Sequence, residues 1–171
     1  MRKSVILIVL LFAAGITANA QKFALIDMEY ILKNIPAYEN ANEQLNQVSQ
    51  QWQGEVEKVS GEAKDLYKNY QSESSSLSDV QKGKKEEAIV AKEKEASELR
   101  RQYFGPEGDL AKKRESLMKP IQDEIYNVVK EISEQKGYSA VIDRASATSI
   151  IFASPSIDIS NEVLSRLGYS N

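Results

Sequence analysis

The chain has 171 residues, 22 of them basic and 25 acidic, which gives a formal net charge of −3. It contains no histidine and no cysteine. The sequence therefore excludes Ser-His-Asp and Cys-His nucleophiles, the commonest zinc ligand and any disulfide framework. Its acidic balance disfavours nucleic acid as a partner, because phosphate binding is driven by concentrated basic charge.

Residues 1–20 have the pattern of a removable secretory signal. Arg2 and Lys3 precede the apolar run 5–14, which is too short to cross a bilayer. The small residues of 18–20 predict cleavage after Ala20, and the alternative interpretation is an N-terminal membrane anchor. Loss of the two basic residues would lower the net charge to −5. We expect a mature protein that begins at Gln21, without stable membrane insertion.

A strand is predicted at Lys22–Asp27, directly after the signal. Asp27 can cap a short helix that carries Tyr30 and Ile31 before Pro36 interrupts it.

A long helical region is predicted over residues 37–136. Apolar residues recur at steps of three and four from Tyr38 to Tyr70, which indicates one narrow stripe on a long helix. The pattern returns less regularly over 89–132, and the serine-rich segment 72–85 between the two predicts an exposed turn. Two such helices should fold back into an antiparallel hairpin.

Gly105-Pro106 is the most unusual local feature of the second helix, because proline removes a backbone hydrogen bond and clashes with the preceding turn. A kink is expected near 102–106. It is either a hinge that lets the hairpin splay or a fixed bend. Pro120 predicts a second interruption of the same helix.

Two further strands are predicted at Tyr138–Asp143 and Ser149–Ala153. A last helix, capped by Asp158 or Ser160, should end at Gly168. The fold class is therefore α+β: residues 21–36 and 137–171 form a small β-rich head, and 37–136 form a helical hairpin arm. A head of this size is expected to oligomerise in order to cover its apolar surface.

Exposed apolar side chains on the arm are candidate contacts for a bound polypeptide. Tyr67 lies beside the apolar stripe, and Leu77 and Val80 lie near the tip. Trp52, Tyr70 and Tyr103 keep to the stripe and are interpreted as part of the seam between the helices.

The opening strand 22–27 and the endings 137–143 and 158–164 resemble those of the Skp family of periplasmic chaperones, also called the OmpH family. The resemblance covers the whole mature chain. It implies a homotrimer with a β-rich head and three helical arms that holds unfolded outer-membrane β-barrel proteins without ATP in the periplasm. Family members are strongly basic, whereas residues 37–136 have 16 basic and 20 acidic residues, so no lipopolysaccharide site is carried over.

The sequence thus predicts an ATP-independent holdase that is not an enzyme and has no cofactor. No glycine-rich phosphate loop is present. One alternative is a structural or adaptor coiled coil of the cell envelope, in which the arm pairs with a defined partner helix. Another is an envelope hydrolase with paired carboxylates, which would need a concave pocket.

Overall fold

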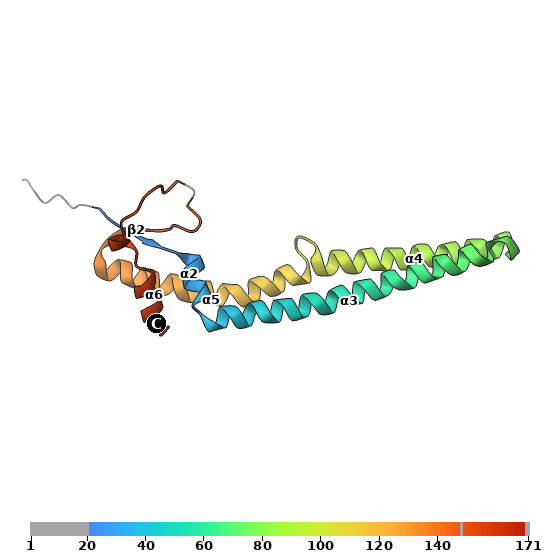
Figure 1. Cartoon of the computed structure of the whole chain (residues 1–171), viewed down its shortest axis with the longest axis horizontal. Helices are drawn as coiled ribbons and strands as arrows, with labels where there is room; N and C mark the ends of the chain where they lie inside the picture. Colours follow the sequence, from blue (N-terminus) through green and yellow to red (C-terminus); the bar gives the residue numbers. More distant parts are fainter. Residues whose placement is uncertain (1–20, 148, 170–171) are drawn as a thin grey trace, which may run out of the picture. The chain divides into compact units, whose positions relative to one another are not determined.

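The computed structural model describes residues 21–147 and 149–169. The predicted signal sequence and the cleavage position after Ala20 lie outside the described residues. The elements run in the order β1 (Lys22–Ile26), α2 (Met28–Lys33), α3 (Pro36–Glu73), η1 (Ser74–Ser76), α4 (Asp79–Phe104), α5 (Asp109–Lys136), β2 (Tyr138–Asp143), η2 (Pro155–Ile157) and α6 (Ser160–Arg166) (Figure 1).

The chain divides into two compact units. The hairpin unit comprises Leu32–Tyr126, and the terminal unit combines the residues up to Ile31 with those from Asn127 onward. The two ends of the chain therefore fold into one unit, as expected for an α+β protein in which a helical segment separates the strands.

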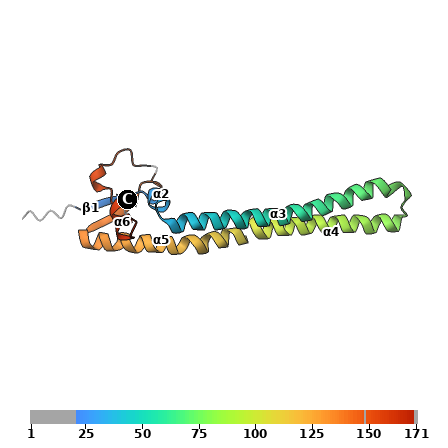
Figure 2. The same ribbon diagram turned by 60° about the horizontal axis from the view of Figure 1, so that its bottom comes forward.

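Helices α3 and α4 form an antiparallel hairpin and run side by side in both ribbon views (Figures 1 and 2). As residue numbers rise along α4, the residues that they contact on α3 have lower numbers, as an antiparallel pair requires. Near the tip, Lys85 pairs with Glu73, and farther along, Lys92 pairs with Glu62 at 2.9 Å. The predicted hairpin is confirmed.

The hairpin core follows the predicted apolar stripe. Its buried side chains are small or branched and lie on facing sides of the two helices: Ala41, Leu45, Val56 and Ala63 from α3, and Ile89 and Ala96 from α4. The stripe is narrow, so most side chains on both helices remain exposed. A hairpin of this kind is stabilised by its seam rather than by a deep core.

The tip of the hairpin is shorter than predicted. Helix α3 continues to Glu73 and α4 already begins at Asp79, so the predicted turn 72–85 is wrong at its C-terminal end. Ser78 explains the early start, because its hydroxyl accepts the N–H of Gln81 and its own N–H donates to the Gln81 side chain at 2.9 Å. This capping box satisfies donors at the helix start and outweighs the serine-rich composition.

The kink predicted near 102–106 is a complete break between α4 and α5. The N–H of Gly105 donates to the carbonyl of Arg101 at 2.9 Å, and Gly105 then turns into an extended conformation, as residues before proline prefer. Gly108 closes the next turn onto Gly105, and α5 starts at Asp109. Pro106 therefore ends a helix rather than bending one.

Pro120, in contrast, lies inside an uninterrupted α5, so the predicted second interruption is wrong. Proline leaves the carbonyl of Ser116 without its helical donor. Both residues are exposed, so water can hydrogen-bond to that carbonyl and the helix continues.

The terminal unit contains a two-stranded parallel sheet of β1 and β2. The third strand predicted at Ser149–Ala153 is wrong: within 21–147 and 149–169 the segment forms no ladder. The free side of β1 is used instead by a single bridge between Leu25 and Asp158, where the N–H of Ile159 donates to the Leu25 carbonyl at 2.9 Å. The segment 149–153 joins neither that side of β1 nor the outer edge of β2, which has β1 as its one neighbour in the described sheet.

The core of the terminal unit packs the inner residues of β1 against three helical segments. Its buried side chains are Ala24, Leu25 and Ile26 from β1, Ile31 from α2, Ile132 from α5, and Ile159, Val163 and Leu164 at α6. Gly168 has φ of 85°, and the Tyr169 N–H donates to the Leu164 carbonyl beyond it. The predicted end of the last helix at Gly168 is confirmed, because a left-handed residue is a common helix terminator.

Candidate functional site

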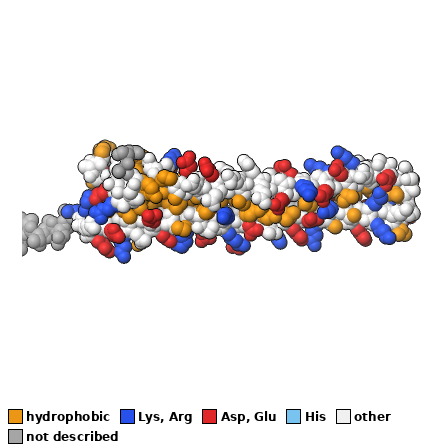
Figure 3. Space-filling view, turned by 90° about the horizontal axis from the view of Figure 1, so that it is seen from below, with side chains coloured by type: hydrophobic (Ala, Val, Ile, Leu, Met, Phe, Trp, Pro, Cys, Tyr) orange, Lys and Arg blue, Asp and Glu red, His pale blue; other side chains and the backbone are white. Residues whose placement is uncertain are grey.

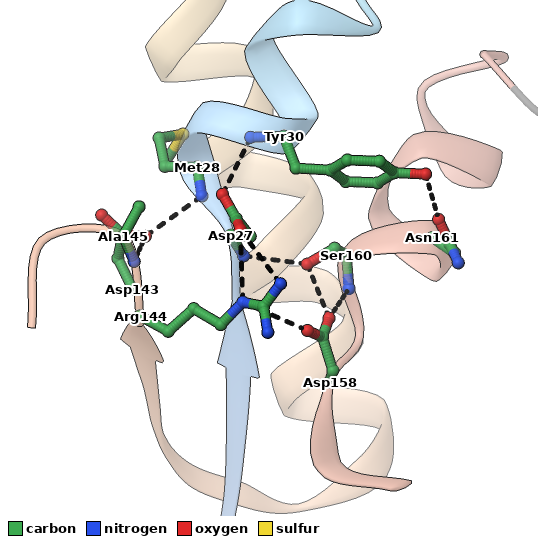
Figure 4. A network of polar contacts seen from close by, with 9 residues as sticks. All are labelled: Asp27, Met28, Tyr30, Asp143, Arg144, Ala145, Asp158, Ser160 and Asn161. Carbon is green, nitrogen blue, oxygen red and sulfur yellow. Dashed lines mark hydrogen bonds and ion pairs between the residues drawn. The ribbon is translucent and has the colours of Figure 1, made fainter. Parts of the chain in front are cut away.

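A polar network joins the ends of β1 and β2 to the segment before α6 (Figure 4). The N–H of Asp27 donates to Ser160 Oγ at 2.8 Å, and that hydroxyl donates to Asp158 Oδ1 at 2.6 Å. Arg144 reaches Asp27 Oδ2 at 3.1 Å and Asp158 Oδ2 at 3.6 Å. Ser160 is the buried polar residue at its centre. The network fixes three segments that are far apart in the sequence.

Asp143 holds the junction between β2 and α2. Its Oδ1 accepts the backbone N–H groups of Met28 at 3.1 Å and Ala145 at 3.0 Å. Partial burial alone would raise the pKa of Asp143, but these hydrogen bonds together outweigh that effect and hold the pKa below its usual value. Asp143 is therefore charged at neutral pH and stabilises the native terminal unit.

Acid is expected to destabilise the protein through this carboxylate. The pKa of Asp143 in the folded protein is lower than its value of ~3.9 in the unfolded chain. The stabilisation from this carboxylate is therefore complete above the unfolded-state pKa, and it is lost as the pH falls through the folded-state pKa. The pKa values of Glu55 and Glu62 are also lowered, mainly by hydrogen bonds from Tyr103 and Lys92, and act in the same direction. The urea concentration at the unfolding midpoint, measured between pH 7 and pH 2.5, should decrease once the pH is below about 4.

Asp143→Asn provides the control, because asparagine keeps an acceptor oxygen but does not titrate. This variant should be less stable at pH 7 and should lose less stability on acidification than the parent protein. Parallel pH profiles for the two proteins would contradict the assignment to Asp143.

Two large apolar side chains project from the terminal unit at Ile151 and Phe152. Their side chains are 101% and 84% exposed, more than those of any other large apolar residue in the described part of the chain. They lie between Arg144 and Asp158 of the polar network, in the segment 149–153, which makes no strand pairing. Two adjacent exposed apolar side chains of this size are typical of a surface that another molecule covers.

An aromatic pair packs the C-terminal end of α4 against α3. The rings of Trp52 and Tyr103 stack with centroids 4.8 Å apart and planes at 5°. The Tyr103 hydroxyl donates to Glu55 Oε2 at 2.6 Å, which lowers the pKa of Glu55 and raises that of Tyr103. The seam predicted for these aromatics is confirmed here, and the pair lies directly before the break at Gly105.

Two of the open grooves on the hairpin unit contain residues that the sequence singled out, Tyr67 in one and Gly105 in the other. The first, which we call the lateral groove, has a volume of about 540 Å³ and lies between α3 and α4. It is lined by Ser60, Ala63, Lys64, Tyr67, Lys68 and Gln71 from α3, and by Glu93, Ala96, Ser97 and Arg100 from α4. The second, of about 580 Å³, lies at the helix break and is lined largely by apolar side chains, among them Tyr38, Phe104, Leu110 and Met118.

Neither a metal site nor a membrane-spanning helix is found within 21–147 and 149–169. No group of three or more Asp and Glu side chains there is placed to hold a metal ion. No helix in the same ranges combines the length and the hydropathy that a bilayer requires.

Comparison with known families identifies the chain. The family model for outer membrane protein (OmpH-like) matches residues 22–167. The chain belongs to the OmpH-like family. The match runs from β1 to the end of α6 and so includes both units, and the predicted family is confirmed. No curated protein matches the chain.

A solved structure supports the OmpH-like fold. It is of a protein from Caulobacter crescentus CB15 that carries the assignment outer membrane chaperone (OmpH-like). The TM-score is 0.69 at 12% sequence identity, over 86% of this chain and 83% of the other. This OmpH-like chain therefore shares the α+β fold of that structure.

The predicted client contacts of the OmpH-like chain lie at different places. Tyr67 is 49% exposed and lines the lateral groove, whereas Val80 is 71% exposed at the start of α4. Leu77 is half-buried at the tip. Gly105 and Pro106 lie in the break between α4 and α5. Leu77 and Val80 are both at the tip, whereas Tyr67 lies in the groove, and the role of all three in client binding stays a prediction.

Sequence reasoning missed the lateral groove and the Ser160 network. The groove needs the register between α3 and α4, which periodicity alone does not give. Small residues at Ser60, Ala63, Ala96 and Ser97 were the available signal, because facing small side chains leave a depression between two helices. The network joins Asp27 to residues more than a hundred positions away, for which the sequence offers no local signal.

Proposed function

We propose that this OmpH-like protein is an ATP-independent periplasmic holdase that binds unfolded outer-membrane β-barrel proteins between helical arms and prevents their aggregation. The observation that carries the proposal is the family match over residues 22–167. The functional form is a homotrimer joined through the terminal units, with the hairpins as arms. It uses no cofactor and performs no catalysis.

The surface of the helices suits weak and adaptable contacts. Figure 3 shows hydrophobic side chains as an orange band along the helices, with basic and acidic side chains on its flanks. Scattered apolar groups such as Val80 and Val90 are exposed beside charged residues. Each contact with a client would be weak, and affinity would come from many contacts across several arms. A client held in this way stays mobile and leaves without chemical energy.

The terminal unit supplies a surface for oligomerisation. Ile151 and Phe152 are exposed and their segment has no strand partner within the described chain. β2 has only β1 as a neighbour in the sheet, so its other edge offers unpaired backbone groups. Pairing of these features between copies would cover both and would extend a sheet that is too small to shield itself.

The direct test dilutes a urea-unfolded outer-membrane β-barrel protein into buffer without nucleotide, with and without protein that starts at Gln21. Light scattering should report soluble assemblies with one client per trimer and less aggregation. An oligomer that leaves the aggregation unchanged would contradict the holdase and favour an adaptor coiled coil with one defined partner.

The helix break is proposed as a hinge that adapts the arms to clients of different size. In the observed conformation, a Cβ on Gly105 would lie 2.4 Å from the Arg101 carbonyl oxygen, and one on Gly108 would lie 2.7 Å from that of Gln102. Replacing Gly105, Pro106 and Gly108 with alanine should therefore disfavour the break and favour one continuous helix. Solution scattering should report a narrower distribution of maximum dimensions.

Pro120→Ala is the matched control for the hinge, because it removes a proline from an unbroken helix. This variant should leave the distribution of dimensions unchanged. A triple-alanine protein with the dimensions of the parent would identify the break as a fixed bend.

A further inference from the structure

The lateral groove concentrates positive charge on an otherwise acidic helical region. Lys64 and Lys68 line it from α3 and Arg100 lines it from α4, against the single carboxylate of Glu93 in the lining. Residues 37–136 as a whole have more acidic than basic side chains. The net charge of the groove lining is therefore positive, whereas that of residues 37–136 as a whole is negative.

These three cations are not neutralised by the chain itself. Within 21–147 and 149–169, no ion pair forms with Lys64, Lys68 or Arg100, although all three are exposed. The neighbouring Lys92, in contrast, lies 2.9 Å from both Glu62 and Glu95. The groove thus holds positive charge that is available to an external partner.

The register of the hairpin spreads the three cations along the groove. Tyr103 stacks on Trp52 and Lys92 pairs with Glu62, so Arg100 lies toward the Ser60 end. Lys64 and Lys68 are one helical turn apart, about 6 Å along the axis. Alternate side chains of an extended strand recur at about 6.6–6.8 Å on one face. The spacing of Lys64 and Lys68 therefore matches two carboxylates two positions apart in an extended chain, and Arg100 adds a cation farther toward the Ser60 end.

The floor of the groove suits a backbone rather than a bulky group. Ala63 and Ala96 are buried and Ser60 and Ser97 are small, so the floor is shallow and narrow. Tyr67 stands at the rim with its ring half exposed and can contact an apolar side chain between two carboxylates.

We infer that the lateral groove docks an extended segment of a client chain that carries carboxylates at alternate positions. The inference rests on the proposed holdase function and specifies which part of a client this site takes. Lys64, Lys68 and Arg100 would contact the carboxylates, and Tyr67 would contact an apolar side chain of the same segment. The groove would select extended strands over collapsed ones, because only an extended chain has this repeat.

The test uses two fluorescent nine-residue peptides of the same composition and fluorescence anisotropy with protein that starts at Gln21. In one peptide glutamate and valine alternate, and in the other they form two blocks. The alternating peptide should bind more tightly. Lys64→Ala, Lys68→Ala and Arg100→Ala combined should weaken its binding by about tenfold, since three exposed charge pairs are lost.

The matched control combines Lys58→Ala, Lys84→Ala and Arg101→Ala, which remove the same charge from exposed positions of the same two helices outside the groove. This variant should bind the alternating peptide like the parent protein. Circular dichroism should show the same helix content in both variants, because all six side chains are exposed.

Three results would overturn the inference: equal binding of the two peptides, equal losses in the two variants, or a groove variant that loses binding only to phosphatidylglycerol vesicles. The aggregation assay separates this failure from that of the proposed function. If the parent protein suppresses aggregation but binds the two peptides equally, the holdase function is supported and this docking site is not. A parent protein that binds the alternating peptide but does not suppress aggregation retains the site without the holdase.

Discussion

Replacing Ile151 and Phe152 together with aspartate is expected to convert the proposed oligomer into monomers at micromolar concentration. Burial of each apolar side chain in an interface contributes about 1.5–3 kcal/mol, and a carboxylate in the same place would also have to be desolvated. The combined loss corresponds to at least a hundredfold weaker association per protomer. Sedimentation velocity should show the change in mass, and suppression of client aggregation should fall with it.

The control for this interface uses two other exposed apolar residues. Val90→Asp and Tyr126→Asp change the same charge at positions that are 61% and 66% exposed on helices. This protein should keep the parental mass. A double variant at 151 and 152 that sediments like the parent would place the interface elsewhere.

Ile132→Ala is expected to lower the free energy of unfolding by about 2–5 kcal/mol, the range measured for truncation of a large buried aliphatic side chain. Ile132 is fully buried in the terminal unit, and alanine would leave a cavity beneath the sheet. Urea unfolding followed by circular dichroism at several protein concentrations checks the value, because association also contributes to apparent stability.

Two further substitutions separate cavity formation from helix propensity. Ile132→Val removes one methylene and should cost about 0.5–1.5 kcal/mol. Val90→Ala lies on the exposed face of α4 and should change stability by less than about 0.5 kcal/mol. Equal effects of Ile132→Ala and Val90→Ala would show that packing around Ile132 contributes nothing.

The hairpin could be predicted because its information is local and repeated. Buried Ala41, Leu45, Val56 and Ala63 all belong to the stripe that the spacing of apolar residues defines. The strand at Tyr138–Asp143 was predicted with the bounds that the structure has, since it is rich in β-branched and aromatic residues.

The errors arose where a local preference depends on a partner. Ile150, Ile151 and Phe152 have the composition of a strand, but composition alone does not supply pairing. Asp158 and Ile159 occupy the free edge of β1, and the outer edge of β2 stays unpaired within the described residues. At the tip, the serine-rich composition favoured a turn, whereas the capping box at Ser78 starts a helix. Composition predicts a preference, and the available hydrogen-bond partners decide the outcome.

The candidate site was only partly predictable for the same reason. Tyr67 was expected to be exposed beside the stripe, and it is. Its neighbours Lys64 and Arg100 lie on different helices, so their common groove depends on how α3 and α4 align. That alignment comes from specific cross-helix contacts such as the Trp52–Tyr103 stack, which no single-helix pattern specifies.

The parallel pairing of β1 with β2 has a consequence for the order of folding. Lys22 lies opposite Tyr138, so β1 finds its partner only after the whole hairpin has been synthesised. Such long-range pairing folds slowly, whereas the hairpin between the strands has mostly sequential contacts and can form early. In the proposed homotrimer, the arms would therefore form before the unit that is proposed to join the copies. A chain that ends before β2 could form the hairpin but would not be expected to assemble, so assembly would itself be a check on completeness.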